Sequence, residues 1–114
     1  MKFYESTPYT QGTQQVALVD IDETICKSID QNYLNATPIL ERVRKINALF
    51  EDGNIIKLYT ARGSKTGIDW TDKTLKQLSD WGVKYHELNL GKPFADYYID
   101  DKAISDTDFD WRIN

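Results

Sequence analysis

The chain has 114 residues, a formal net charge of −4 and a single cysteine. This length suits one compact domain, residues 1–114, and is too short for two ordinary domains. The acidic balance argues against non-specific binding to nucleic acid or to an anionic membrane. One cysteine excludes an internal disulfide framework, and no apolar stretch approaches the ~20 residues that span a bilayer. We therefore expect a soluble cytoplasmic domain.

The first half of the chain opens with a polar extension, residues 1–14, which we expect to be a short extra strand or a frayed terminus. Residues 15–20 form the first predicted strand, because an apolar run of this length indicates a buried strand. Residues 23–36 mix polar and isolated apolar side chains and are predicted to form a loop or small flap.

A helix is predicted next, with Thr37 as its N-cap and Pro38 at its first helical position. Gly53 is suited to end it, because glycine tolerates the left-handed conformation that follows many helices. The helix carries an apolar stripe at helical spacing. Its members are Ile39, Val43, Ile46 and Phe50.

The second half of the chain repeats the alternation of strands and helices. The predicted elements are a strand at 54–59, a helix from Asp69 or Thr71 to Trp81 with Leu75 and Leu78 facing inward, a strand at 83–88 and a short strand at 95–99. Alternating strands and helices indicate a parallel sheet. We therefore predict an α/β fold of three layers, a Rossmann-like parallel sheet with helices on both faces.

Polar residues follow three of the predicted strands. Asp20 and Asp22 follow the first, Thr60 follows the second, and Asp100 with Asp101 follows the last. Parallel strands bring these ends to one edge of the sheet, which is where ligands bind in open α/β folds. Two like charges ~4 Å apart cost about 4 kcal/mol at an effective dielectric near 20. A hard divalent cation is the common means of offsetting that cost.

Each residue has a simpler interpretation when taken alone. An isolated pair such as Asp20 and Asp22 is more often a turn or a helix cap. Lys92 alone is usually a surface lysine, and Arg62 alone is more often a solvent-facing residue than a ligand of substrate. The occurrence of all these residues in this order argues against the simpler interpretations.

The set resembles the haloacid dehalogenase-like phosphohydrolases over residues 15–105. Its motifs are Asp20-Ile21-Asp22-Glu23-Thr24, Thr60, Lys92 and Asp100-Asp101. The stretches at 60–63 and 91–103 are similar to small capless members associated with capsular polysaccharide biosynthesis. Many members of that family have glycine at the position of Glu23, where it eases a tight turn, so Glu23 departs from the family pattern in the flap.

The resemblance implies a role for each residue. Asp20 would be the nucleophile that forms an aspartyl-phosphate, and Asp22 the general acid and base. Mg²⁺ would be held by Asp20, by Asp22 through its backbone carbonyl, and by Asp100 and Asp101. The remaining groups would bind substrate: Thr60 by a hydrogen bond to a phosphoryl oxygen, Lys92 by its charge, and Arg62 near the mouth of the site.

We therefore expect a Mg²⁺-dependent phosphatase acting on a small phosphomonoester, with a sugar phosphate as the leading substrate. Neither segment that follows the first two motifs is long enough for a cap domain. The site should be open, or closed by a neighbouring subunit of a homo-oligomer. Two alternatives remain: a phosphotransferase that uses the same site, and a non-catalytic module that holds a phosphorylated ligand or a partner protein.

Overall fold

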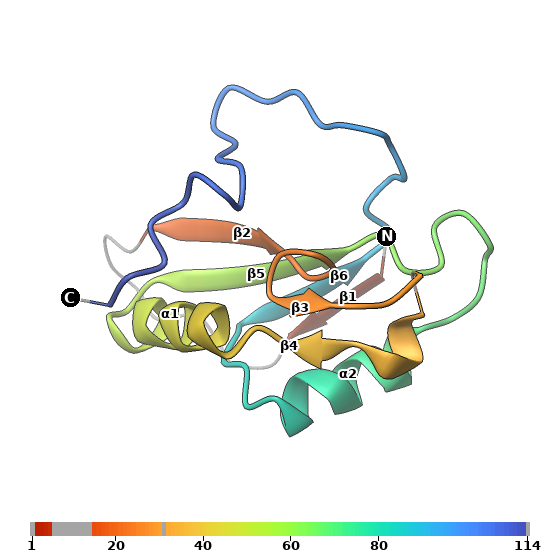
Figure 1. The fold of residues 1–114 in the computed structure, drawn as a ribbon, viewed down its shortest axis with the longest axis horizontal. Coiled ribbons are helices and arrows are strands. Elements are labelled where there is room, and N and C mark those ends of the chain that lie inside the picture. Colours follow the sequence, from red (N-terminus) through yellow and green to blue (C-terminus); the bar gives the residue numbers. More distant parts are fainter. Residues whose placement is uncertain (1, 6–14, 31, 114) are drawn as a thin grey trace.

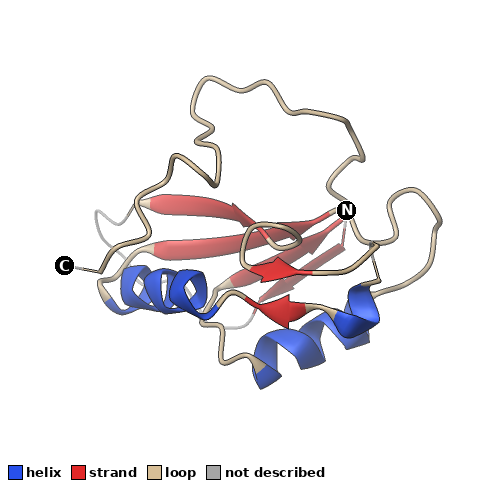
Figure 2. Cartoon of the chain, in the orientation of Figure 1, coloured by secondary structure: helices blue, strands red, loops and turns tan. Residues whose placement is uncertain are grey.

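The protein is built on a four-stranded sheet in which three neighbouring strands are parallel. The computed structural model describes residues 2–5, 15–30 and 32–113. The strands follow the order β1-β6-β5-β2. Their bounds are Lys2–Glu5 for β1, Val16–Asp20 for β2, Ile55–Thr60 for β5 and Glu87–Leu90 for β6. Figure 1 shows the sheet with β2 at one edge, and Figure 2 shows the same view by secondary structure.

The parallel strands β2, β5 and β6 end at a common edge. Val16 of β2 is paired with Ile55 of β5, and Asp20 with Tyr59. Thr60 of β5 is in turn paired with Leu90 of β6. The strands predicted at 15–20 and 54–59 are thereby confirmed to within a residue. Strand β1 pairs antiparallel with β6, which confirms an extra strand for residues 2–5. Residues 6–14 lie outside the described part of the chain.

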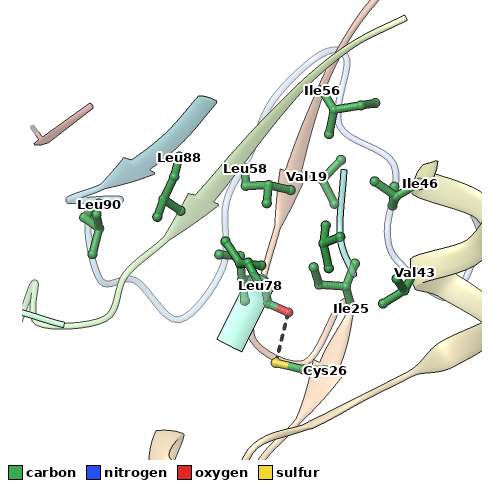
Figure 3. Packing of buried hydrophobic residues seen from close by; sticks show 12 residues of the cluster. Val19, Ile25, Cys26, Val43, Ile46, Ile56, Leu58, Leu78, Leu88 and Leu90 are labelled. Carbon is green, nitrogen blue, oxygen red and sulfur yellow. Dashed lines mark hydrogen bonds between the residues drawn. The ribbon is translucent and has the colours of Figure 1, made fainter. Parts of the chain in front are cut away.

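Two helices pack on one face of this sheet. Helix α1 spans Leu40–Glu51 and helix α2 spans Thr71–Asp80. Figure 3 shows Val43 and Ile46 of α1, together with Leu78 of α2, packing on the buried side chains of the strands. The buried positions of β5 alternate along the strand, which indicates one covered face. The prediction of helices on both faces was wrong for the described residues.

The segment between β2 and α1 folds into a small flap. Strand β3, Cys26–Lys27, pairs antiparallel with β4, Thr37–Pro38, and a short 3-10 helix, η1, spans Tyr33–Asn35 between them. The predicted flap is confirmed, and no cap domain is present in the described chain. The predicted N-cap at Thr37 was wrong. Thr37 and Pro38 belong to the flap hairpin, and Ile39 stands at the N-cap without a side-chain hydrogen bond.

Helix ends agree more closely with the sequence patterns. Gly53 and Gly82 both have positive φ angles just beyond the ends of α1 and α2, as predicted. Asp69 accepts hydrogen bonds from both the backbone N–H and the hydroxyl of Thr71, so it braces the first turn of α2. No helix among the described residues is long and apolar enough to cross a membrane.

The prediction fails in the last third of the chain. The third parallel strand is β6 at Glu87–Leu90, not the predicted 83–88. Residues 95–99 form no strand at all. The C-terminal segment, residues 91–113, instead leaves the sheet, arches past the β2 side of the molecule and returns to α1 (Figure 1).

Candidate active site

Four of the predicted site residues meet at the carboxyl edge of the parallel strands. Asp20 ends β2, Asp22 lies just beyond it, and Thr60 ends β5. Lys92 is drawn to the same place because the backbone N–H groups of Gly91 and Lys92 both donate to the carbonyl oxygen of Thr60, at 3.2 and 3.1 Å. Hydrogen bonds between the strand ends therefore position the cluster.

Asp20 lies between a cation and a hydroxyl. Its Oδ1 is 3.2 Å from Lys92 Nζ, and its Oδ2 accepts a hydrogen bond from Thr24 Oγ1 at 3.2 Å. Burial raises the pKa of the Asp20 carboxyl above its ordinary value, while the charge of Lys92 and the two hydrogen bonds act against that rise. A partly desolvated carboxylate beside a cation is suited to attack an electrophilic centre.

Asp22 is held by a second cation, Arg62. Arg62 Nε lies 3.1 and 3.0 Å from the two Asp22 carboxylate oxygens, and Nη2 lies 2.8 Å from Oδ1. This two-pronged contact fixes the plane of the carboxylate more tightly than a single bond would. The Thr60 hydroxyl also donates to Asp22 Oδ2, at 3.2 Å.

The structure corrects the expectation for Arg62. We predicted a residue at the mouth that binds substrate, yet Arg62 is only 2% exposed. Its Nη1 donates to Thr74 Oγ1 and Gln77 Oε1 of α2, at 3.1 and 2.5 Å, and its guanidinium lies over the Tyr33 ring. Arg62 therefore orients Asp22 from inside the protein.

Sequence reasoning missed Thr74 and Gln77 as members of this network. Both are buried polar residues on the inward face of α2, beside Leu78. Polar side chains three positions apart on an otherwise core-facing stripe are a signal that a buried charge lies opposite. Gln77 also donates to the Tyr33 carbonyl oxygen at 2.6 Å, which links α2 to the flap.

The turn after Asp22 adopts a conformation that glycine favours. Glu23 has φ 63°, in the left-handed region. Its backbone N–H donates to the Cys26 carbonyl oxygen at 2.9 Å, and its carboxylate accepts from the Ser28 N–H at 3.1 Å. Glu23 thus adopts a backbone conformation that glycine reaches more easily.

Asp100 and Asp101 do not join the cluster. Both are exposed within the C-terminal segment, and Asp100 Oδ1 accepts a hydrogen bond from the Lys102 N–H at 3.0 Å. The described residues of one copy contain no group of three or more His, Cys, Asp or Glu side chains that could hold a metal ion. The carboxylates of Asp20 and Asp22 already face Lys92 and Arg62. One copy by itself therefore does not fit the predicted magnesium site.

A small pocket of about 230 Å³ opens beside the cluster. Residues 62–64 and 67–70 line it on one side, and Leu90 with Gly91 on the other. It shares Arg62 with the cluster, although neither Asp20 nor Asp22 lines it. The pocket lies at the carboxyl edge of β5 and β6, the edge at which ligands bind in open α/β folds.

Comparison with known proteins identifies the fold but not the family. No protein-family model matches the chain, and no curated protein matches it. A solved structure of a structural-genomics target from Vibrio cholerae is similar, with a TM-score of 0.78 and 26% identity. The likeness covers 89% of this chain and 90% of that one. A small α/β protein with a three-stranded parallel sheet and two helices is thus the class that the fold defines.

Proposed function

We propose that this chain is a phosphatase of the haloacid dehalogenase-like type that hydrolyses a phosphomonoester through Asp20. The observation that carries the proposal is the position of the Asp20 carboxylate. It stands at the end of a parallel strand, 3.2 Å from Lys92 Nζ and next to the second carboxylate of the motif. Phosphoryl transfer depends mainly on positioning and on neutralising charge, and this arrangement offers both.

The proposed reaction has two steps. In the first, an Asp20 oxygen forms a bond to phosphorus while the bond to the leaving alcohol oxygen breaks, and that oxygen takes a proton from Asp22. In the second, water gives a proton to Asp22 and attacks the phosphorus, and the bond to Asp20 breaks to release inorganic phosphate. Lys92 offsets the charge on the phosphoryl oxygens, to which Thr60 would donate.

The acid–base role requires Asp22 to move. Both of its carboxylate oxygens are bound by Arg62, and one also accepts from Thr60. To reach a leaving oxygen, Asp22 must release at least one of these bonds when substrate binds. The hydrogen bonds of catalytic groups commonly rearrange in this way between the free and the bound enzyme.

The proposed substrate class follows from the residues that line the site. Lys92 suits the phosphoryl group, and the pocket formed by residues 62–64 and 67–70 with Leu90 and Gly91 is lined by polar residues such as Ser64 as well as apolar ones such as Ile68. A small polar alcohol such as a sugar suits this lining better than a lipid. An acceptor alcohol in place of water would make the same site a phosphotransferase, which adding candidate acceptors to the assay distinguishes.

A non-catalytic binding module is the second candidate, and one observation favours it. Asp22 is locked in a salt bridge with a buried arginine, an arrangement that a binder needs no less than an enzyme. In such a module Lys92 and Thr60 would hold a phosphate that is never cleaved.

A panel of phosphomonoesters, assayed for phosphate release with Mg²⁺, tests the proposal. We expect turnover by the wild type, loss of turnover in Asp20→Asn, and a decrease of ~10²–10⁴-fold in Asp22→Asn. Asp80→Asn, an exposed change on α2, is the matched control and should leave the rate unchanged. Binding of phosphorylated ligands without any turnover would reject the enzyme and support the module.

A further inference from the structure

We propose that a second copy of this chain completes the site. Residues 95–99 of one copy would add to the free edge of β2 in the other as a parallel strand, and would carry Asp100 and Asp101 to Asp20. The catalytic use of this arrangement rests on the proposed phosphatase function. The arrangement itself rests on the free strand edge, the exposed segment and the short connection between β6 and residue 95.

Among the described residues, strand β2 has a free edge and a face that no helix covers. It is the last strand in the sheet order, so its outer edge has no partner strand among the described residues. Val16 is 53% exposed and Leu18 is 63% exposed on the face opposite the helices. A long exposed apolar edge strand is a template for pairing with another chain, and stable proteins normally cover it.

The C-terminal segment offers a matching strand. Tyr97 is 75% exposed and Ile99 is 90% exposed, in a stretch where every residue from 93 to 105 is exposed. Tyrosine and isoleucine are strand formers, and residues 95–99 are as long as β2. One chain thus carries two exposed apolar elements of equal length that do not meet.

The chain cannot make this parallel pairing with itself. The Lys92 N–H is bonded to the Thr60 oxygen at the carboxyl end of β5. A parallel strand beside β2 would have to begin at the opposite end, level with Val16 and Ile55. The six residues of β5 cover about 20 Å, whereas the three peptide units from Lys92 to Ala95 reach at most about 11 Å.

An antiparallel strand within one copy would not bring Asp100 and Asp101 to Asp20. Such a strand would start at the carboxyl edge and run away from it, leaving Asp100 and Asp101 at the wrong end of β2. Parallel strands of one chain need a connection of about a dozen residues or more, and only residues 91–94 lie between Leu90 and Ala95. A connection too short to fold back favours exchange of the element between copies.

A contact of Asp106, further along the C-terminal segment, is consistent with this segment binding beside β2. Arg42 of α1 donates to the Thr24 oxygen at 2.9 Å and to Asp106 Oδ2 at 2.8 Å. Within one copy, Asp106 therefore lies beside the loop that follows Asp20 and Asp22. In an exchanged dimer, residues 95–101 and Asp106 of one copy would both reach the body of the other, and the exchange would be reciprocal.

Exchange would supply the carboxylates that one copy lacks. Asp20 and Asp22 would be joined by Asp100 and Asp101 from the second copy, giving the oxygen-rich set that a hard divalent cation prefers. Each site would then be incomplete without the partner.

Cross-linking tests the arrangement without reference to activity. Leu18→Cys and Tyr97→Cys are made in separately tagged full-length chains, refolded together and treated with a bismaleimide of about 10 Å reach. We expect a Leu18→Cys to Tyr97→Cys product that joins the two tags. Lys73→Cys, exposed on α2, replaces Leu18→Cys in the control and should give no such product. The native Cys26 is fully buried and should not react.

Complementation then tests whether the exchange serves the proposed function. Asp20→Asn and the double variant Asp100→Asn/Asp101→Asn should each be inactive. When equal amounts of the two chains are refolded together, half of the dimers contain one chain of each kind. Each mixed dimer has one intact site of two, so the mixture should recover about a quarter of wild-type activity. Wild-type activity in the double variant alone would remove the acidic pair from the site.

The two experiments separate the two hypotheses. Absence of the inter-tag product overturns the exchange, whatever the activity. The product without any phosphatase activity in the wild type upholds the exchange and rejects the proposed function. The product with an active wild type but no complementation would mean that the exchanged strand does not supply the site, which overturns the inference as stated.

Discussion

Lys92 Nζ lies 3.2 Å from Asp20 Oδ1, and this ion pair joins the end of β2 to the residue that follows β6 by two positions. Burial alone would raise the pKa of Asp20 and favour its protonated, non-nucleophilic form. Lys92 acts against that effect. The pair thus keeps a partly buried carboxylate available for attack, while Lys92 is also placed to meet a phosphoryl group.

Lys92→Met should move the acid limb of the pH–rate profile to higher pH. Removing the cation removes the influence that lowers the pKa of Asp20 and leaves burial, which raises it. Because the nucleophile must be ionised, kcat/KM of the variant should begin to fall at a higher pH than that of the wild type. Lys76→Met, an exposed change on α2, is the control. An acid limb at the wild-type pH would show that Lys92 does not tune Asp20.

Asp20→Asn should have a higher free energy of unfolding than the wild type, and the difference should be larger at neutral pH than at acidic pH. The folded pKa of Asp20 is raised above the ordinary value of 3.8, so the folded protein binds the proton more tightly than the unfolded chain. The ionised Asp20 carboxylate therefore lowers the free energy of unfolding of the wild type. This cost is absent below that ordinary value and appears as pH rises through the raised pKa. Urea unfolding from about pH 4 to about pH 7 measures the difference. If the stability difference between Asp20→Asn and the wild type became smaller toward neutral pH, the pKa of Asp20 would not be raised by folding.

Local patterns predicted the elements that stand on local interactions. The apolar runs at 15–20 and 54–59 placed β2 and β5 to within a residue, and the glycines after α1 and α2 placed the C-terminal ends of both helices. Pro38 misled the prediction because its fixed φ angle suits a short flap strand as well as a first helical turn. The strand at 95–99 misled it more seriously. Its composition suits a strand, but the length of the connection before it, which composition does not report, forbids the parallel pairing.

The site was predictable where a motif marks it and not where partners are distant. Asp20, Asp22, Thr60 and Lys92 meet as expected, since parallel strands deliver their ends to one edge. The burial of Arg62 was not predicted, because its partners Asp22 and Gln77 lie on other elements. An arginine after a strand looks the same in sequence whether it faces solvent or the core.

Arg62→Met should destabilise the protein by about 3 kcal/mol, because breaking a buried ion pair by removing one partner leaves the other charge uncompensated. The estimate lies at the low end of the usual range, since the Asp22 side chain is 19% exposed and can recover some hydration. Arg112→Met is the matched control: Arg112 also pairs with an aspartate, Asp110, but at the surface. We expect no measurable loss there. Equal effects of the two changes in urea unfolding would reject a structural role for Arg62.

Mg²⁺ should raise the melting temperature of the wild type but not of Asp100→Asn/Asp101→Asn. A ligand that binds only the folded state stabilises it by RT ln(1 + [L]/Kd), about 2.7 kcal/mol at a hundredfold excess over Kd. Chelation of the metal should reverse the shift and abolish phosphate release. Thermal melts with Mg²⁺ and with Na⁺ at matched ionic strength make the measurement. The same Mg²⁺ shift in the double variant would exclude the acidic pair as ligands.

Cys26 should resist thiol reagents until the flap opens. The thiol is fully buried on β3, and burial raises its pKa to about 12, helped by the nearby charge of Asp22. Its Sγ also lies 3.6 Å from the Ile21 carbonyl oxygen, as a weak donor (Figure 3). Because the thiolate is the reactive form, both burial and pKa suppress reaction. With a chromogenic disulfide at neutral pH we expect slow labelling that accelerates in urea, against fast labelling of Tyr97→Cys in the same assay. Rapid stoichiometric labelling of Cys26 in the native protein would mean that the flap opens freely and exposes the thiol.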